Sequence, residues 1–356
     1  MSGILFGTRV STLLGIELPI LGAPMGGVAG PDLVAAVSNA GGLGILGHAT
    51  LEPDEVQRQI RQTKQLTSKR FGIGLLFPSH DGALVSPPTR THPLPAFLEP
   101  FIDTHTHVTE SPKRYDAETA ERRLEIAIAE GVAVLALGLG APEHVIRRAK
   151  AAGMTVVALV GSRRAALEVE ARGADILVAQ GHEAGGHTGR TSTLVLVPQV
   201  VDAVKVPVIA AGGIIDGRGL AAAIMLGAQG ALVGTRLLAT PEAETAQSHK
   251  YKIVEMRDDE TVVSRCYTGK PSRVIRNAFI EAWKGHDSEI LPMPEQWDMV
   301  APVVAPAKAK GSIEVGNWPT GQGAILVDDI LPAGDVVRRM AADADALIRR
   351  SATVTA

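Results

Sequence analysis

Eight short apolar runs, separated by amphipathic stretches, constrain the fold of this chain more than any other sequence feature. The runs occupy residues 19–24, 42–46, 72–77, 132–137, 155–160, 175–179, 207–211 and 230–233. Most contain consecutive Val, Ile, Leu and Ala instead of alternating apolar and polar residues, which is typical of parallel strands covered on both faces. We therefore predict an α/β fold, a TIM (β/α)8 barrel, with its functional loops at the carboxyl ends of the strands.

Two stretches interrupt this pattern of strands and helices. Residues 78–116 contain seven prolines and show no clear periodicity, so we predict a long loop excursion after the third strand. Its His105 and His107 have a spacing that could hold a metal, but no carboxylate or cysteine set completes a site, and we predict no metal. Residues 241–319 predict a small appendage inserted after the eighth strand.

The appendage is expected to be mainly helical. Helical periodicity covers residues 242–255 and 272–283, a Pro- and Met-rich linker follows, and a last helix is predicted at 332–349. The barrel is assigned to residues 12–240 and 320–350, and the appendage is expected to lie over its mouth.

The charge and the cysteine content exclude several classes of function. A formal net charge of −3 provides no basic surface for nucleic acid, so we expect no nucleic-acid partner. The single cysteine, Cys266, excludes an intramolecular disulfide and a thiolate zinc cluster. No run reaches the ~18 apolar residues that a membrane span requires. We expect a cytoplasmic protein without a membrane partner. Whether it forms a homodimer is left open by the sequence.

The sixth apolar run leads into residues 179–190, a loop with four glycines, two histidines and a glutamate. Barrel strands present catalytic groups on such loops, so we predict that this is the active-site loop. His187 is the predicted catalytic base, because an imidazole titrates near neutral pH and its glycine neighbours let a ligand approach closely. His182, Glu183 and His48 are predicted substrate contacts. Glu183 could instead orient His187 or cap the next helix.

Glycine-rich turns after the seventh and eighth strands predict a phosphate site. Gly212-Gly213 and Gly234-Thr235 occupy the two loops that usually bind phosphate in such barrels, through exposed backbone N–H groups. Small residues at the end of the first strand would let a flat ring lie against the backbone, and flavin mononucleotide (FMN) fits better than a sugar phosphate. The predicted cofactor contacts are Ala23, Pro24, Met25, Gly26, Gly74, Gln180, Gly185, Gly186, Gly212, Gly213, Leu232, Val233, Gly234 and Thr235.

These segments also resemble a known family. Similarity to the nitronate monooxygenase (2-nitropropane dioxygenase) family of FMN-dependent barrels lies in Gly22-Ala23-Pro24-Met25, in the loop from Gln180 to His187, in Ala211-Gly212-Gly213-Ile214, in Leu232-Val233-Gly234-Thr235 and in Gly269-Lys270-Pro271-Ser272-Arg273. The resemblance runs in order from about residue 12 to residue 350. It implies that Gln180 and Gly185 contact the flavin and that His187 is the catalytic histidine. The FMN phosphate would be held by Gly213 and by residues 232–235.

One position departs from the family pattern. The family usually carries asparagine in the third strand, where this chain has Gly74, and the departure bears on the substrate more than on FMN. Arg190 and Lys270 could bind an anionic group of the substrate, but we interpret both as solvated surface charges.

The resemblance implies oxidation of alkyl nitronates, and of nitroalkanes once a base removes their α-proton, by O2 to a carbonyl compound and nitrite. The alternative is an FMN-dependent NAD(P)H reductase acting on a quinone or an enoyl-ACP, because such reductases share the Ala184 to His187 motif. An isomerase or aldolase is disfavoured, because none of the eight runs contains a lysine and only Asp175 is acidic. Cys266 lies beyond the eighth strand, which argues against a cysteine-nucleophile barrel.

Overall fold

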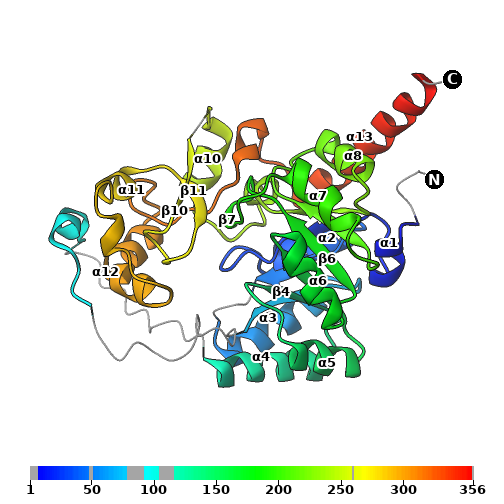
Figure 1. Ribbon diagram of the computed structural model, residues 1–356, viewed down its shortest axis with the longest axis horizontal. Coiled ribbons are helices and arrows are strands. Elements are labelled where there is room, and N and C mark those ends of the chain that lie inside the picture. Colours follow the sequence, from blue (N-terminus) through cyan, green and yellow to red (C-terminus); the bar gives the residue numbers. More distant parts are fainter. Residues whose placement is uncertain (1–6, 48–50, 78–91, 104–115, 259, 355–356) are drawn as a thin grey trace.

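Eight parallel strands form the centre of the structure (Figure 1). The computed structural model describes residues 7–47, 51–77, 92–103, 116–258 and 260–354. The strands form one sheet in the order β1-β9-β8-β6-β5-β4-β3-β2, and a parallel bridge between Leu21 and Leu43 joins its two edges. The sheet therefore closes on itself, and the predicted barrel is confirmed.

Each predicted run overlaps one barrel strand, which extends at most one residue past the end of the run, and helices follow most of the strands. The barrel strands are β1 (Ile20–Gly22), β2 (Ile45–Gly47), β3 (Gly72–Leu76), β4 (Val134–Gly138), β5 (Thr155–Val160), β6 (Ile176–Gln180), β8 (Val208–Ala211) and β9 (Ala231–Val233). The helices that accompany them are α1 (Arg9–Leu14), α2 (Pro31–Asn39), α3 (Pro53–Leu66), α4 (Ala117–Ala129), α5 (Glu143–Ala151), α6 (Arg163–Ala171), α7 (Thr193–Val201), α8 (Gly217–Met225), α9 (Thr235–Leu238) and α13 (Ala333–Val354).

Two apolar layers hold the barrel together. The larger layer lies between the strands and the surrounding helices, and the smaller one fills the barrel interior. Val10 and Leu14 of α1 are fully buried in the interior layer. Arg9 of the same helix donates to the carbonyl of Lys205, shortly before β8, so α1 closes the amino end of the barrel. The carboxyl end is left for the functional loops.

An appendage beside the barrel combines helices with a small sheet (Figure 1). Its elements are α10 (Gln247–Glu255), β10 (Thr261–Ser264), β11 (Ser272–Ile275), α11 (Ala278–Ala282), η2 (Asp287–Glu289) and α12 (Glu295–Ala309). The sheet has the order β10-β11-β7, and β7 (Gly186–His187) comes from the active-site loop. The appendage is therefore hydrogen-bonded to that loop, at the carboxyl end of the barrel.

Two predictions for the appendage were wrong. The helix predicted at 272–283 is a strand over its first four residues, because Ser272–Ile275 pairs with β10 and β7. Helix α11 starts only after Asn277, whose side chain caps the helix by accepting from the N–H of Ile280 (3.1 Å). The predicted linker contains the 15-residue helix α12. Its internal Pro302 and Pro306 disfavour a helix interior, so local propensity did not predict this helix.

Part of the excursion after β3 packs against the appendage. The 3-10 helix η1 (Ala96–Phe101) contributes Leu98 to an apolar cluster with α11 and α12, and Figure 1 shows it beside them. Phe97 meets Trp283 edge to face with ring centroids 5.1 Å apart, an arrangement that stabilises by ~1 kcal/mol beyond the area it buries. His105 and His107 lie outside the described residues. No helix in the described part of the chain is long and apolar enough to cross a membrane.

Candidate active site

The loop after β6 is folded back on itself by hydrogen bonds. The side-chain amide of Gln180 donates to the carbonyl of His187 (2.7 Å), and the hydroxyl of Thr188 donates to the carbonyl of Gly181 (3.1 Å). The antiparallel register pairs His187 with Ser272 and Gly186 with Arg273. His187 is therefore fixed from both sides at the carboxyl end of the barrel.

The imidazole of His187 contacts the appendage. Its Nε2 lies 3.1 Å from the hydroxyl of Thr268, and that hydroxyl donates to the backbone carbonyl of Lys270 (3.2 Å). A hydroxyl has one proton, so when Thr268 donates to this carbonyl it accepts from Nε2–H, and Nδ1 of His187 is then the unprotonated nitrogen. Burial and, next, the Lys270 ammonium lower the pKa of His187 to about 4, below the near-neutral titration expected from the sequence. At neutral pH the ring is uncharged and in the form that can accept a proton.

A second histidine, His249, is connected to the active-site loop through Thr320. His249 of α10 is 1% exposed, and its two ring nitrogens each lie 2.9 Å from a hydroxyl, that of Thr245 and that of Thr320. The backbone next to Thr320 packs on the active-site loop: a Cβ on Gly185 would lie 2.7 Å from the nitrogen of Gly321. Burial, and less strongly the charge of Lys308, lowers the pKa of His249 to about 3.

These two histidines predict a loss of stability in mild acid. In the unfolded chain both take up a proton near pH ~6.5, whereas in the folded protein they stay neutral until about pH 4 and about pH 3. The folded state thus binds fewer protons in this window, so the free energy of unfolding should fall from about pH 7 to pH 5, by up to ~3 kcal/mol per pH unit. Urea titrations at the two pH values measure it. His249→Gln should remove about half of this dependence, and an unchanged dependence would contradict the assignment.

Glu183 caps α7. Its carboxylate accepts from the backbone N–H and from the hydroxyl of Thr193, both at 2.9 Å, at the first residue of the helix. The capping alternative is thus the observed one, and no hydrogen bond to His187 is found for Glu183 in the described structure. His182 donates from Nδ1 to the carbonyl of Gly189 (2.8 Å). Substrate contacts of Glu183 and His182 stay predictions, and His48 lies outside the described residues.

Three segments predicted to hold the cofactor meet at the carboxyl end of the barrel. The N–H of Ala23, at the end of β1, donates to the carbonyl of Val233 in β9 (2.9 Å). A Cβ on Gly234 would lie 3.6 Å from the Cβ of Ala23, and a Cβ on Gly26 would meet nothing within 4 Å. Gly213 has φ +73°, which a residue with a side chain rarely adopts. The open backbone at these glycines fits a phosphate and a flat ring.

The same segments are tied to the last part of the barrel. The hydroxyl of Thr235 accepts from the N–H of Gly321 (2.9 Å), and the N–H of Gln322, the first residue of η3 (Gln322–Leu326), donates to the carbonyl of Glu183 (2.9 Å). Residues around Gly321 therefore connect the predicted phosphate loop to the active-site loop. Sequence reasoning did not identify this link.

Gly74 is buried against Pro24, which lies just after the end of β1. A Cβ at this position would lie 2.3 Å from the Cβ of Pro24, so the proline ring fills the space that a side chain would need. This packing is the physical reason why glycine, and not the asparagine usual in the resembling family, fits here. The predicted contact of Gly74 with the cofactor stays a prediction.

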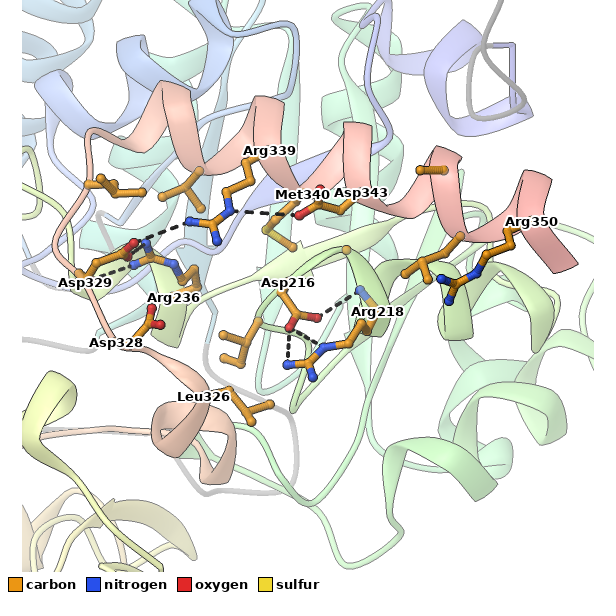
Figure 2. Close-up of a pocket in the computed structure, with 16 residues that line it drawn as sticks. Asp216, Arg218, Arg236, Leu326, Asp328, Asp329, Arg339, Met340, Asp343 and Arg350 are labelled. Atoms are coloured by element: carbon orange, nitrogen blue, oxygen red, sulfur yellow. Dashed lines mark hydrogen bonds and ion pairs between the residues drawn. The ribbon is translucent and has the colours of Figure 1, made fainter.

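A charged pocket lies outside this site, between α8, α13 and the segment that joins η3 to α13 (Figure 2). None of the predicted site residues lines it. Figure 2 shows its charges directed at one another: Asp216 at Arg218, and Asp329 at both Arg236 and Arg339. Arg236 is only 7% exposed and follows the predicted phosphate loop directly. We interpret the pocket as a network of ion pairs, called the polar seam below, in which Asp329 connects Arg236 of α9 with Arg339 of α13.

The seam predicts a specific effect on stability. In Asp329→Ala the buried guanidinium of Arg236 loses the carboxylate 2.5 Å away, and because Asp329 is itself 33% exposed we expect a loss of ~2 kcal/mol in the free energy of unfolding. Asp335→Ala, which breaks a pair of more than half-exposed side chains with Arg338, should cost less than ~0.5 kcal/mol. Urea unfolding measures both variants. Equal losses would show that Arg236 does not depend on Asp329.

Comparisons with known proteins identify the family of this chain. The family model for nitronate monooxygenase matches residues 8–343. A probable nitronate monooxygenase of Staphylococcus saprophyticus is 35% identical over 338 residues, which are 90% of this chain and 93% of that protein. A (3aS,4S,5R,7aS)-5-hydroxy-7a-methyl-1-oxo-octahydro-1H-indene-4-carboxyl-CoA dehydrogenase of Rhodococcus jostii is 37% identical over 275 residues, 77% of this chain and 67% of that protein. The crystal structure of a nitroalkane oxidase from Streptomyces ansochromogenes has a TM-score of 0.83 at 30% identity and covers 96% of this chain and 99% of that one.

Proposed function

Because the chain belongs to the nitronate monooxygenase family, an oxidoreductase family, we propose that it oxidises alkyl nitronates with O2 to a carbonyl compound and nitrite, with FMN as its flavin. The observation that carries this proposal is the position of His187. A neutral imidazole held by Thr268 lies on the loop that follows β6, at the end of the barrel where the predicted cofactor segments also meet. We therefore assign base, substrate and flavin to one end of the barrel.

FMN is proposed because the residues present fit it. The turns at Gly213 and at Gly234-Thr235 offer backbone N–H groups to a phosphate, and Gly26 leaves open space beside the end of β1. A bound flavin supplies the electron acceptance that no side chain of this chain can provide.

His187 is the proposed base for neutral nitroalkanes. Its Nδ1 accepts the α-proton, so that the substrate becomes the electron-rich nitronate, while Thr268 keeps Nε2 protonated and the ring oriented. Gln180 holds the backbone of His187 in place through its amide. The substrate is a small molecule, and these groups position it and move its proton.

Steady-state assays test this function. The purified protein, given an alkyl nitronate in air, should consume O2 and release nitrite with a carbonyl product. The second candidate is an FMN-dependent NAD(P)H reductase, favoured by the similarity to a dehydrogenase of Rhodococcus jostii. Oxidation of NADH or NADPH with a quinone or an enoyl thioester, without nitrite from nitronates, would replace our proposal by this one.

A further inference from the structure

Lys270 is brought close to His187 by the antiparallel pairing of β7 with β11. Ser272 is the register partner of His187, and the N–H of Thr188 donates to the carbonyl of Pro271 (3.4 Å), which continues the pairing towards Lys270. After burial, the charge of Lys270 is the second cause that lowers the pKa of His187. The ammonium therefore lies within electrostatic range of the imidazole, at the same end of the barrel.

Thr268 joins the two residues directly. Its hydroxyl lies 3.1 Å from Nε2 of His187, accepts from the N–H of Lys270 (3.3 Å) and donates to the carbonyl of Lys270 (3.2 Å). Thr268 is only 3% exposed, so this arrangement is fixed within the packed appendage. The backbone of Lys270 is therefore held beside the imidazole.

The ammonium of Lys270 has no counter-ion in the described structure. Lys150, Lys252 and Lys310 each pair with a carboxylate, whereas no carboxylate pairs with Lys270 among the described residues. Lys270 is nevertheless half-buried, and burial lowers its pKa. A partly buried cation without a partner is costly, and an anionic ligand would offset that cost.

We propose that Lys270 is the substrate-binding cation of this site, and that it selects the anionic nitronate over the neutral parent nitroalkane. The inference rests on the proposed function, which supplies the substrate. A nitronate carries its charge on two oxygens, and an ammonium offers three N–H donors to them beside the neutral ring of His187. The interpretation of Lys270 as a solvated surface charge is replaced by this role.

The test compares Lys270→Met, which keeps the length of the side chain and removes its charge, with Lys270→Arg. Lys284→Met is the matched control, because Lys284 is a 72% exposed lysine in the same appendage. For each flavin-loaded protein we would measure kcat and KM with an alkyl nitronate and with its neutral nitroalkane. We would also measure the Kd of nitrate, an unreactive planar oxyanion, from the change in flavin absorbance.

Lys270→Met should raise the KM for the nitronate and the Kd of nitrate by about 10- to 100-fold, with less than ~3-fold change in the KM for the nitroalkane. Lys270→Arg should restore most of the affinity, and Lys284→Met should match the wild type. Equal changes for charged and neutral substrates, or no change in nitrate binding, would overturn the role of Lys270. A wild type that binds nitrate through Lys270 but does not oxidise nitronates would overturn the proposed function alone.

Discussion

His187→Asn is expected to lower kcat/KM for neutral nitroalkanes by about 10²- to 10⁴-fold, because the amide cannot accept the α-proton. Activity with a preformed nitronate should fall much less, since that substrate needs no base. The imidazole is neutral at the pH of the assay, so the wild-type rate with nitroalkanes should persist until the pH approaches the pKa of about 4. Initial rates of nitrite release with both substrates, across this pH range, measure these effects.

The control for this variant is His144→Asn. His144 lies on α5, contacts Glu121 and is about half-exposed. It precedes the active-site loop in the sequence and is not part of it. Its replacement should leave both activities within ~2-fold of the wild type, and flavin content should be the same in all three proteins. Equal losses of nitroalkane and nitronate activity in His187→Asn would assign His187 to binding or to structure instead of proton transfer.

Gly234→Ala is expected to weaken FMN binding by about 100-fold, which corresponds to ~2.7 kcal/mol. The fold has room for the methyl group, because the new Cβ would lie 3.6 Å from the Cβ of Ala23 and 3.8 Å from the sulfur of Met25, both ordinary contacts. The methyl would, however, fill the gap between the ends of β1 and β9, where the predicted phosphate and ring contacts meet. Titration of the apoprotein with FMN measures the change in Kd.

Gly161→Ala is the matched control for the cofactor site. Gly161 also lies at the carboxyl end of a barrel strand, β5, and its Cβ would be 3.8 Å from the Cα of Gly189. We predict no contact with the flavin there, so FMN affinity should stay within ~3-fold. If both variants lose FMN equally, any substitution at the carboxyl end of the barrel weakens FMN binding, and the predicted phosphate loop has no specific role.

The barrel could be predicted from the sequence because its signal is local. Each of the eight runs is long enough for one buried parallel strand, and Pro31 and Pro53 mark helix starts where their missing N–H is harmless. The appendage was predicted less well. Ser272–Ile275 becomes a strand only because it pairs with β10 and β7, a contact between distant segments that no local pattern reveals.

The same distant pairing explains what was missed in the site. The position of His187 follows from its own loop, but its partners Thr268 and Lys270 come from the segment before β11. The signal that could have identified Lys270 was the family resemblance from Gly269 to Arg273, where the sequence alone indicated only a solvated surface charge. Thr268 lies just before that segment. Glu183 had two local explanations, and only the position of Thr193 decides for the helix cap.

The flavin absorbance spectrum of the purified protein, recorded without oxygen, tests the central claim most directly. An alkyl nitronate is added to one sample, and NADH and NADPH to two others. We predict that the nitronate bleaches the flavin and that the nicotinamides have little effect. Rapid bleaching by NADH or NADPH with no response to the nitronate would contradict the proposed function and favour the reductase, and a protein that binds no flavin would contradict both.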